Sequence, residues 1–254
     1  MNQQDWQTRT RLLIGDEGIV KLAKSHVLVA GLGGVGAYAA EQLARAGVGK
    51  LTLVDGDTVH NSNRNRQLPA LITSLGKPKT EVMALRLRDI NPEIQLDLVT
   101  AYIKDQLLMD VVQKPYDFVI DAIDTLAPKV YLLFYARQAG HRVVSSMGAG
   151  GKFDPSLIQV VDISQTQQCR LAYYIRKKLH KLGVWDGITA VYSTEAVAKH
   201  RVRAESGEMN KRSTVGTISY MPAIFGMYCA SVVLRQLLKE TQAVDGAFPF
   251  AGDT

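Results

Sequence analysis

The glycine-rich stretch at residues 31–36 has the residue types and spacing of a phosphate-binding loop. Gly31, Gly33 and Gly36 form a Gly-x-Gly-x-x-Gly motif between a short apolar run and a helical pattern. Glycines allow a tight turn and let a phosphate approach the backbone, while the start of the following helix offers free N–H groups. Asp55 ends the next apolar run, where its carboxylate can accept hydrogen bonds from ribose hydroxyls. Alone, this combination is typical of NAD binding in an oxidoreductase.

The residues that follow Asp55 favour a triphosphate instead. Asn63, Asn65 and Arg66 lie in a polar loop just past that strand end, and Lys79 begins the next helical pattern. Cations of this kind neutralise charge on phosphates and clamp a leaving pyrophosphate. We therefore expect ATP as the nucleotide. The alternative for Arg66 and Lys79 is a role in surface salt bridges.

A third strand end carries the acidic sequence Asp121-Ala-Ile-Asp124. A carboxylate at such an edge suits Mg²⁺ bound together with nucleotide phosphates. We expect Asp124 to be the Mg²⁺ ligand, and its alternative role is a helix cap. Two other classes stay open on the residues alone, namely an NAD oxidoreductase and a tRNA- or protein-binding module without catalysis.

Apolar runs and helical periodicity alternate along the chain. Predicted strands lie at 26–30, 50–54, 94–99, 118–124, 142–147 and 188–193, and predicted helices at 9–24, 35–46, 78–90, 105–113, 127–140 and 169–183, with a last helix from Pro222. This alternation predicts an α/β fold with a doubly wound, Rossmann-like, mostly parallel sheet. Ligands of such sheets bind beyond the carboxyl ends of the strands. We expect a nucleotide domain at 1–150, with residues 1–25 as an arm, and an α+β extension of the same domain at 151–254.

Composition describes an ordinary globular chain with a basic bias. The 254 residues are 46% hydrophobic and 21% charged, and the net charge is +6. Such a bias favours a polyanionic partner, although a solvated basic face has the same composition. The basic residues gather in a predicted helix beside Tyr173 and Tyr174 and in a predicted loop at 199–213. They are Arg170, Arg176, Lys177, Lys178, Lys181, Lys199, Arg201, Arg203, Lys211 and Arg212.

Several classes of protein are disfavoured. The two cysteines, Cys169 and Cys229, form no Cys-x-x-Cys pair, so a four-thiolate zinc site is excluded. Residues 1–20 are charged and lack the apolar core of a secretory leader, which predicts a cytoplasmic protein. The uncharged stretch 215–234 is interrupted by Pro222 and is expected to be a buried helix, so we expect no membrane anchoring.

The order of motifs resembles the ubiquitin-activating-enzyme-like superfamily of adenylating enzymes, which includes ThiF, MoeB and HesA. The resemblance rests on "GLGGVG", "LVDGD", "NSNRNRQ", "GKPKTEVMALRLRDINP" and "VIDAID", in that order. It implies a homodimer in which Arg11 completes the partner's site, and an ATP·Mg²⁺ site with Asp124 on the metal. By this resemblance the catalytic residues are Arg11, Asn63, Arg66, Lys79 and Asp124, of which Asn63, Arg66 and Lys79 contact the phosphates and orient the attack. Tyr102 and Ile103 lie around the adenine. The other implied nucleotide contacts are Gly31, Gly33, Gly34, Gly36, Asp55, Asp57, Asn65 and Gln67.

The second half is similar to one branch, the tRNA threonylcarbamoyladenosine dehydratases. The segments "GAGGKFDPSLIQVVDIS", "VYSTEA" and "SYMPAIFGMYCASVVL" carry this resemblance. It implies ATP-dependent activation of the threonine carboxylate on a modified adenosine near the tRNA anticodon, with cyclisation and net loss of water. It also implies a link to a cysteine desulfurase and sulfur-acceptor system. The chain departs from that branch by being shorter between the basic helix and "VYSTEA". The alternative substrate is the C-terminus of a ubiquitin-like sulfur carrier.

Overall fold

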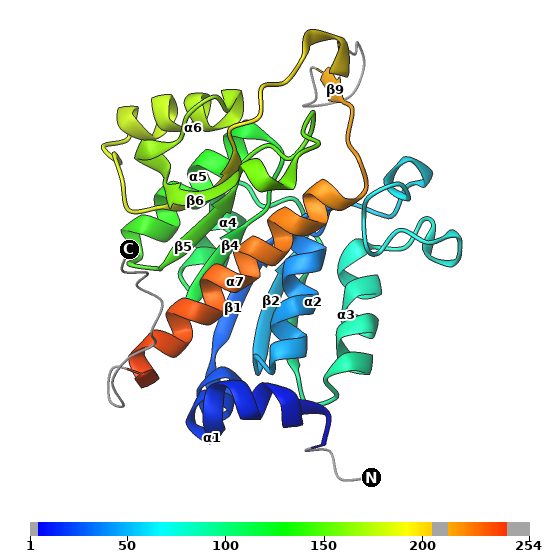
Figure 1. The fold of residues 1–254 in the computed structure, drawn as a ribbon, viewed down its shortest axis with the longest axis vertical. Helices are drawn as coiled ribbons and strands as arrows, with labels where there is room; N and C mark the ends of the chain where they lie inside the picture. Colours follow the sequence, from blue (N-terminus) through cyan, green and yellow to red (C-terminus); the bar gives the residue numbers. More distant parts are fainter. Residues whose placement is uncertain (1–4, 205–212, 243–254) are drawn as a thin grey trace.

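The computed structural model describes residues 5–204 and 213–242 (Figure 1). Its main sheet has seven strands in the order β3-β2-β1-β4-β5-β7-β6. All neighbouring strands are parallel except β6 and β7. The bounds are β1 His26–Ala30, β2 Lys50–Val54, β3 Gln95–Val99, β4 Phe118–Asp121, β5 Val143–Ser146, β6 Ile158–Asp162 and β7 Thr189–Ser193. The predicted mostly parallel α/β sheet is confirmed.

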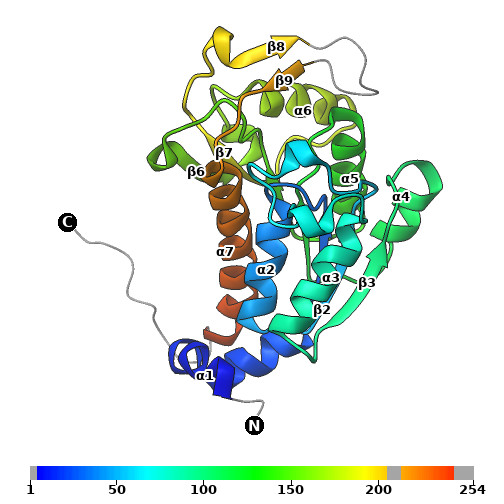
Figure 2. The ribbon, with the colours of Figure 1, turned by 90° about the vertical axis from the view of Figure 1, so that its right-hand side faces the viewer.

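Helices cover both faces of this sheet (Figures 1 and 2). The α-helices are α1 Thr8–Lys24, α2 Gly36–Ala46, α3 Lys79–Ile90, α4 Asp105–Val112, α5 Leu126–Gln138, α6 Arg170–Lys181 and α7 Tyr220–Gln242. Short 3₁₀ helices span Asp5–Gln7, Asn61–Asn63, Ile72–Ser74, Pro155–Leu157, Ile163–Gln165 and Lys199–Arg201.

Two apolar cores follow from the alternation of side chains along the strands. Val27 and Val29 of β1 face one core, shared with α1, α2, α3 and α7. Leu28 and Ala30 face the other, shared with α4, α5 and α6. Because a β-strand alternates its side chains, an uninterrupted apolar run such as 27–30 supplies both cores at once.

Four expectations about the elements were wrong. Strand β6 was not expected. It lies at the sheet edge, pairs antiparallel with β7 and buries its side chains only partly, so its sequence lacks the continuous apolar run of a central strand. Residues 199–213 are not simply a loop, since β8 Val202–Ala204 pairs with β9 Ser213–Val215. The predicted strand 118–124 ends at Asp121, and the last helix begins at Tyr220 rather than Pro222. Lys211 and Arg212 lie outside the described residues.

The C-terminal half completes the sheet that the N-terminal half begins. Strand β7 pairs with β5, and α7 packs against α1 and α2. The segment Tyr220–Lys239 is long and apolar enough to cross a membrane, yet 56% of its most apolar window is buried inside the fold. Within this structure, α7 therefore serves as a core helix that closes one face of the sheet.

Candidate functional site

The carboxyl edge of three adjacent strands gathers most of the predicted site. β1 pairs with β2 and β4, and Ala30 is in register with both Val54 and Asp121. The glycine loop, Asp55 and the segment 122–124 each follow one of these strand ends, so they meet at one edge. The sequence predicts each of these segments at a strand end, and the topology brings them together.

The glycine loop turns too tightly for side chains at two positions. Gly31 has φ +91°, and a Cβ there would lie 2.7 Å from the carbonyl oxygen of Ala122. A Cβ on Gly36 would overlap the carbonyl oxygen of Gly31. These contacts explain why glycine is needed at both positions. The turn delivers the backbone directly into the start of α2, which begins at Gly36.

The middle glycines have different surroundings. A Cβ on Gly34 would lie 2.9 Å from Cβ of Pro222 and 3.4 Å from the carbonyl oxygen of Arg66. The close approach of Pro222, at the start of α7, therefore leaves no space for a side chain at position 34. Gly33 would meet only the amide of Gln67, at 3.6 Å. The Oε1 atom of Gln67 is buried and has no hydrogen-bond partner among the described residues, so an acceptor stands available beside Gly33.

Asp55 braces the glycine loop from the end of β2. Its Oδ2 accepts a hydrogen bond from the backbone N–H of Leu32 at 2.6 Å, and its Oδ1 accepts one from Asp57 N–H at 2.7 Å. Burial raises the pKa of Asp55, and the Lys79 ammonium opposes that shift. Each carboxylate oxygen has a further lone pair, so ribose hydroxyls could still donate to it.

Lys79 lies at the start of α3 and is held in place by Asp57. Its Nζ is 2.8 Å from Asp57 Oδ2, and its side chain is only 4% exposed. Tyr102 donates its hydroxyl to the other oxygen of Asp57, which raises the pKa of Tyr102 to about 12. The Tyr102 side chain is exposed, whereas Ile103 is buried in the core. Of the two residues expected to contact adenine, only Tyr102 is exposed to a ligand.

The loop at 61–67 carries the other predicted cation. Arg66 Nη1 donates to the carbonyl of Ser62 at 3.0 Å and to Asn65 Oδ1 at 2.8 Å. Burial lowers the pKa of Arg66, and the nearby Asp124 carboxylate partly offsets this. Asn63 is buried and accepts from the N–H of His60 at 3.1 Å. Asn63 therefore shapes the loop, and the Arg66 guanidinium interacts electrostatically with the Asp124 carboxylate.

The two acids of the Asp-Ala-Ile-Asp sequence have opposite environments. Asp121 is fully buried against Lys129, with their charged atoms 2.7 Å apart. Burial raises the pKa of Asp121, and the Lys129 ammonium opposes that shift. Asp124 is exposed at the start of α5. No group of three potential metal-ligating His, Cys, Asp or Glu residues occurs among the described residues, so Asp124 would hold Mg²⁺ only together with phosphates.

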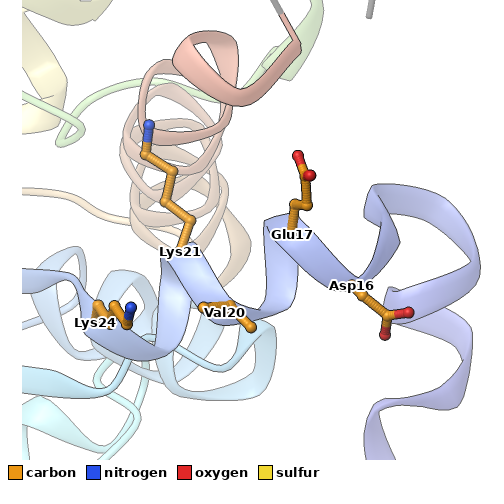
Figure 3. A pocket seen from close by; sticks show the side chains of 5 residues that line it. All are labelled: Asp16, Glu17, Val20, Lys21 and Lys24. Carbon is orange, nitrogen blue, oxygen red and sulfur yellow. The ribbon is translucent and has the colours of Figure 1, made fainter. Parts of the chain in front are cut away.

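Arg11 lies on α1, which Figure 1 shows at the lower end of the molecule, below β1 and β2. α1 leads into the amino end of β1, whereas the glycine loop follows the carboxyl end. Gly15 interrupts the helix with φ +71°, and Arg11 pairs with Asp16. A shallow hollow of about 440 Å³ lies on this helix, not at the glycine loop, and is lined by Asp16, Glu17, Val20, Lys21 and Lys24 (Figure 3).

The segment after β9 reaches the site, which sequence reasoning missed. Asn65 donates its side-chain amide to the carbonyl of Thr217 at 3.1 Å. Gly151 N–H donates to the carbonyl of Gly216 at 2.8 Å, so the same segment also meets the loop after β5. These partners lie 65 or more residues apart, and no spacing in the sequence indicates them.

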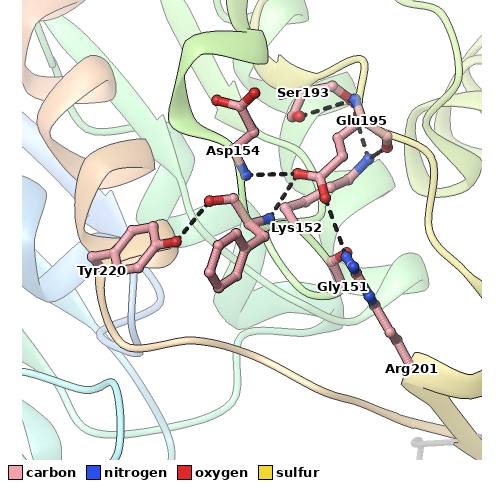
Figure 4. A network of polar contacts seen from close by, with 8 residues as sticks. Gly151, Lys152, Asp154, Ser193, Glu195, Arg201 and Tyr220 are labelled. Carbon is pink, nitrogen blue, oxygen red and sulfur yellow. Dashed lines mark hydrogen bonds and ion pairs between the residues drawn. The ribbon is translucent and has the colours of Figure 1, made fainter.

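A polar network fastens that loop to the chain after β7 (Figure 4). Glu195 accepts hydrogen bonds from the N–H groups of Phe153 at 2.6 Å and Asp154 at 2.9 Å. Arg201 contacts both Glu195, at 3.1 Å, and the carbonyl of Gly151, at 3.0 Å. These bonds lower the pKa of Glu195 against the opposing effect of burial. The network fixes residues 151–154 against Glu195 and Arg201.

Both cysteines are buried and free. Cys169 precedes α6 as its N-cap residue. Burial raises the pKa of the Cys229 thiol to about 12. A thiol in that environment remains protonated, so Cys229 lacks the thiolate character of a nucleophile.

The chain is similar to known proteins over most of its length. The tRNA threonylcarbamoyladenosine dehydratase of Bacillus subtilis (strain 168) is 36% identical over 242 residues, covering 92% of this chain and 95% of its own. The Escherichia coli (strain K12) protein of the same name is 37% identical, covering 92% and 94%. The crystal structure of the E. coli dehydratase, TcdA, in complex with ATP superposes with a TM-score of 0.85 at 36% identity, covering 96% and 98%. The ThiF family model matches residues 7–251, and this chain belongs to the ThiF family.

Proposed function

We propose that this chain is an ATP-dependent tRNA threonylcarbamoyladenosine dehydratase. The observation that carries the proposal is that similarity to such dehydratases runs through both halves of the chain. The B. subtilis enzyme aligns with 92% of this chain and 95% of itself. A nucleotide loop alone would be shared by adenylating enzymes with other substrates. The similarity here also covers the C-terminal half, which adds β6 and β7 to the sheet and places the Thr217 carbonyl against Asn65.

The proposed reaction activates a carboxylate. The threonine carboxylate of the modified adenosine attacks the α-phosphorus of ATP, giving an acyl adenylate and pyrophosphate. Attack by the ureido group on the activated carbonyl then closes a ring and expels AMP, with net loss of water from the nucleoside. Arg66 and Lys79 would stabilise charge on the phosphates, and Asp55 would hold the ribose. The buried Lys79 ammonium and its Asp57 partner support this assignment.

Asp124 is the proposed Mg²⁺ ligand. Mg²⁺ commonly binds one or two carboxylates together with substrate phosphates, and a single exposed carboxylate beside Arg66 fits that pattern. When bound, the ion would neutralise phosphate charge.

Nucleoside mass spectrometry tests the function. tRNA from cells with and without the gene is extracted under mild conditions, and purified protein is incubated with ATP and tRNA carrying threonylcarbamoyladenosine. We expect the cyclic nucleoside to disappear without the gene and to form in vitro together with AMP. ATP–pyrophosphate exchange that requires a ubiquitin-like sulfur carrier, with no cyclic nucleoside, would instead support the sulfur-carrier function.

We also propose that the active unit is a homodimer in which Arg11 reaches the partner's site. Support comes from α1, where Leu12 and Leu13 are 84% and 75% exposed beside Arg11. The site loop has its own exposed apolar group, formed by Leu71 and Ile72. Large exposed apolar groups of this kind are typical of interfaces. A second copy could cover both.

Mixing two inactive variants tests the exchange of Arg11. Arg11→Ala and Asp124→Ala are each expected to abolish AMP release, while tRNA binding remains near that of the unmodified protein. A hybrid dimer holds one site with both native residues, so equal mixing should restore about a quarter of the activity. Hybrid formation is checked with two affinity tags. Hybrids that form without any recovery would contradict a site completed by the partner.

α6 is the proposed surface for the tRNA backbone. It has five Lys or Arg residues and no acidic residue, against a net charge of +6 for the whole chain. Lys177, Lys178 and Lys181 are exposed, as are Tyr173 and Tyr174. Arg176 differs, because it donates to the carbonyl of Thr166 at 2.9 Å. Clustered cations contact phosphates, and exposed aromatic rings can stack on unpaired bases.

Neutralising this surface should weaken tRNA binding without changing ATP binding. In Lys177→Gln/Lys178→Gln/Lys181→Gln, the slope of log affinity against log salt should fall by about 1 for each RNA phosphate that the variant no longer neutralises. Filter binding over a salt series measures the slope. The matched control is Lys24→Gln/Lys114→Gln/Lys239→Gln, which removes three exposed charges elsewhere on the chain. Equal slopes for the two triple variants would rule out α6 as the RNA surface.

A further inference from the structure

A buried polar cluster lies directly behind the exposed Asp124. Asp121 and Lys129 are each 0% exposed. Asp121 Oδ2 also accepts a hydrogen bond from Ser145 Oγ of β5, at 2.6 Å. Because removing two charges from water is costly, replacing such a pair by apolar residues often leaves a protein as stable or more so. Stability alone therefore does not account for the cluster.

The cluster holds the backbone of Ile123 at both of its flanking peptide groups. Asp121 Oδ1 accepts a hydrogen bond from the N–H of Ile123 at 3.1 Å. Lys129 Nζ donates to the carbonyl oxygen of Ile123 at 3.0 Å. Both backbone groups of Ile123 are thus tied to buried side chains, and Asp124 is the next residue. A tether on both sides restricts the direction in which the chain leaves toward Asp124.

The same segment abuts the glycine loop. The N–H of Ala122 donates to the carbonyl of Ala30 at 2.8 Å. A Cβ on Gly31 would come within 2.7 Å of the carbonyl oxygen of Ala122, so the two backbones are in close contact. A shift of residues 122–124 would therefore displace the glycine loop as well as Asp124.

We propose that Asp121, Lys129 and Ser145 are positioning residues that clamp the backbone of Ile123 and so orient the Asp124 carboxylate toward Mg²⁺ and the nucleotide phosphates. This inference rests on the proposed function, because it assumes that Asp124 meets the metal. The three side chains do not touch ATP themselves. Their effect reaches the nucleotide through residues 122–124.

The test separates orientation from stability. Lys129→Met leaves Asp121 as an unpaired buried charge and should lower the melting temperature. In Asp121→Asn/Lys129→Met neither charge remains, so the melting temperature should recover relative to the single variant. ATP affinity is measured by titration calorimetry with Mg²⁺ and with EDTA. In the folded double variant, the gain in affinity from Mg²⁺ should fall by about 10-fold, as when partners behind a metal ligand are removed.

A milder pair of variants provides the matched control. Ser145→Ala removes one hydrogen bond to Asp121 and should reduce the Mg²⁺ gain partially. Ser146→Ala, on the same strand, removes a buried hydroxyl that donates to Met147 and should leave the gain unchanged.

The outcomes distinguish the clamp from the function. The clamp would be overturned if the folded double variant showed the same increase in ATP affinity with Mg²⁺ as the unmodified protein. If the double variant does not fold, the same result in Ser145→Ala would overturn it. Unmodified protein that binds ATP equally with and without Mg²⁺ would instead remove the metal role of Asp124, and with it the basis of the proposal.

Discussion

Lys79→Met is expected to lower the rate of AMP formation by roughly 100-fold or more, the range seen when one charge-stabilising donor is removed from an active site. The ammonium lies at the start of α3, is almost completely buried and is held 2.8 Å from Asp57 Oδ2. Methionine keeps most of the apolar stem but cannot stabilise charge developing on the phosphates. Asp57 retains its bond from Tyr102 and remains partly exposed, so the melting temperature should change little.

Lys77→Met is the matched control for this prediction. Lys77 lies two residues before Lys79, just ahead of α3, and its substitution removes the same charge, but its side chain is exposed. AMP formation is measured by single-turnover kinetics with tRNA and saturating ATP, and tRNA binding is measured in parallel. Similar rates for the two variants would show that Lys79 does not act on the phosphates.

Gly36→Ala is expected to abolish ATP binding and to lower the free energy of unfolding by at least about 2 kcal/mol, the cost of a side chain forced into occupied space. The added Cβ would overlap the backbone carbonyl of Gly31, which lacks the freedom of a flexible side chain. Either the loop or the start of α2 must move. Thermal melting and titration with ATP measure the two effects.

Gly33→Ala separates the two effects in the same loop. Its Cβ would make only an ordinary contact with Gln67, at 3.6 Å, so the fold should be unchanged. ATP binding should still weaken, because the methyl group would lie where we expect a phosphate to approach the backbone.

A Gly36→Ala protein that melts and binds ATP like the unmodified chain would contradict the tight-turn interpretation.

Much of the fold could be predicted because its signals are local. Apolar runs such as 27–30 supply two cores at once, and the helical pattern after Gly36 continues without a break to Ala46. Strand β6 escaped prediction because an edge strand with one half-exposed face carries a weak apolar pattern. The β8–β9 pair escaped it because strands of only three residues, Val-Arg-Ala and Ser-Thr-Val, are too short to show an alternating apolar pattern.

For the site, the sequence by itself determined which residue types follow each strand end, since glycine turns and acidic strand ends are encoded within a few positions. Only the tertiary structure decided which of them face a ligand. Asp121 and Asp124 share one motif, yet one is buried by Lys129 and Ser145 while the other is exposed. Likewise, Pro222 leaves no space for a side chain at Gly34, and the Thr217 carbonyl accepts a hydrogen bond from Asn65. In both pairs the partners are more than 150 residues apart in the sequence. Such contacts depend on how distant segments pack, and no local pattern records them.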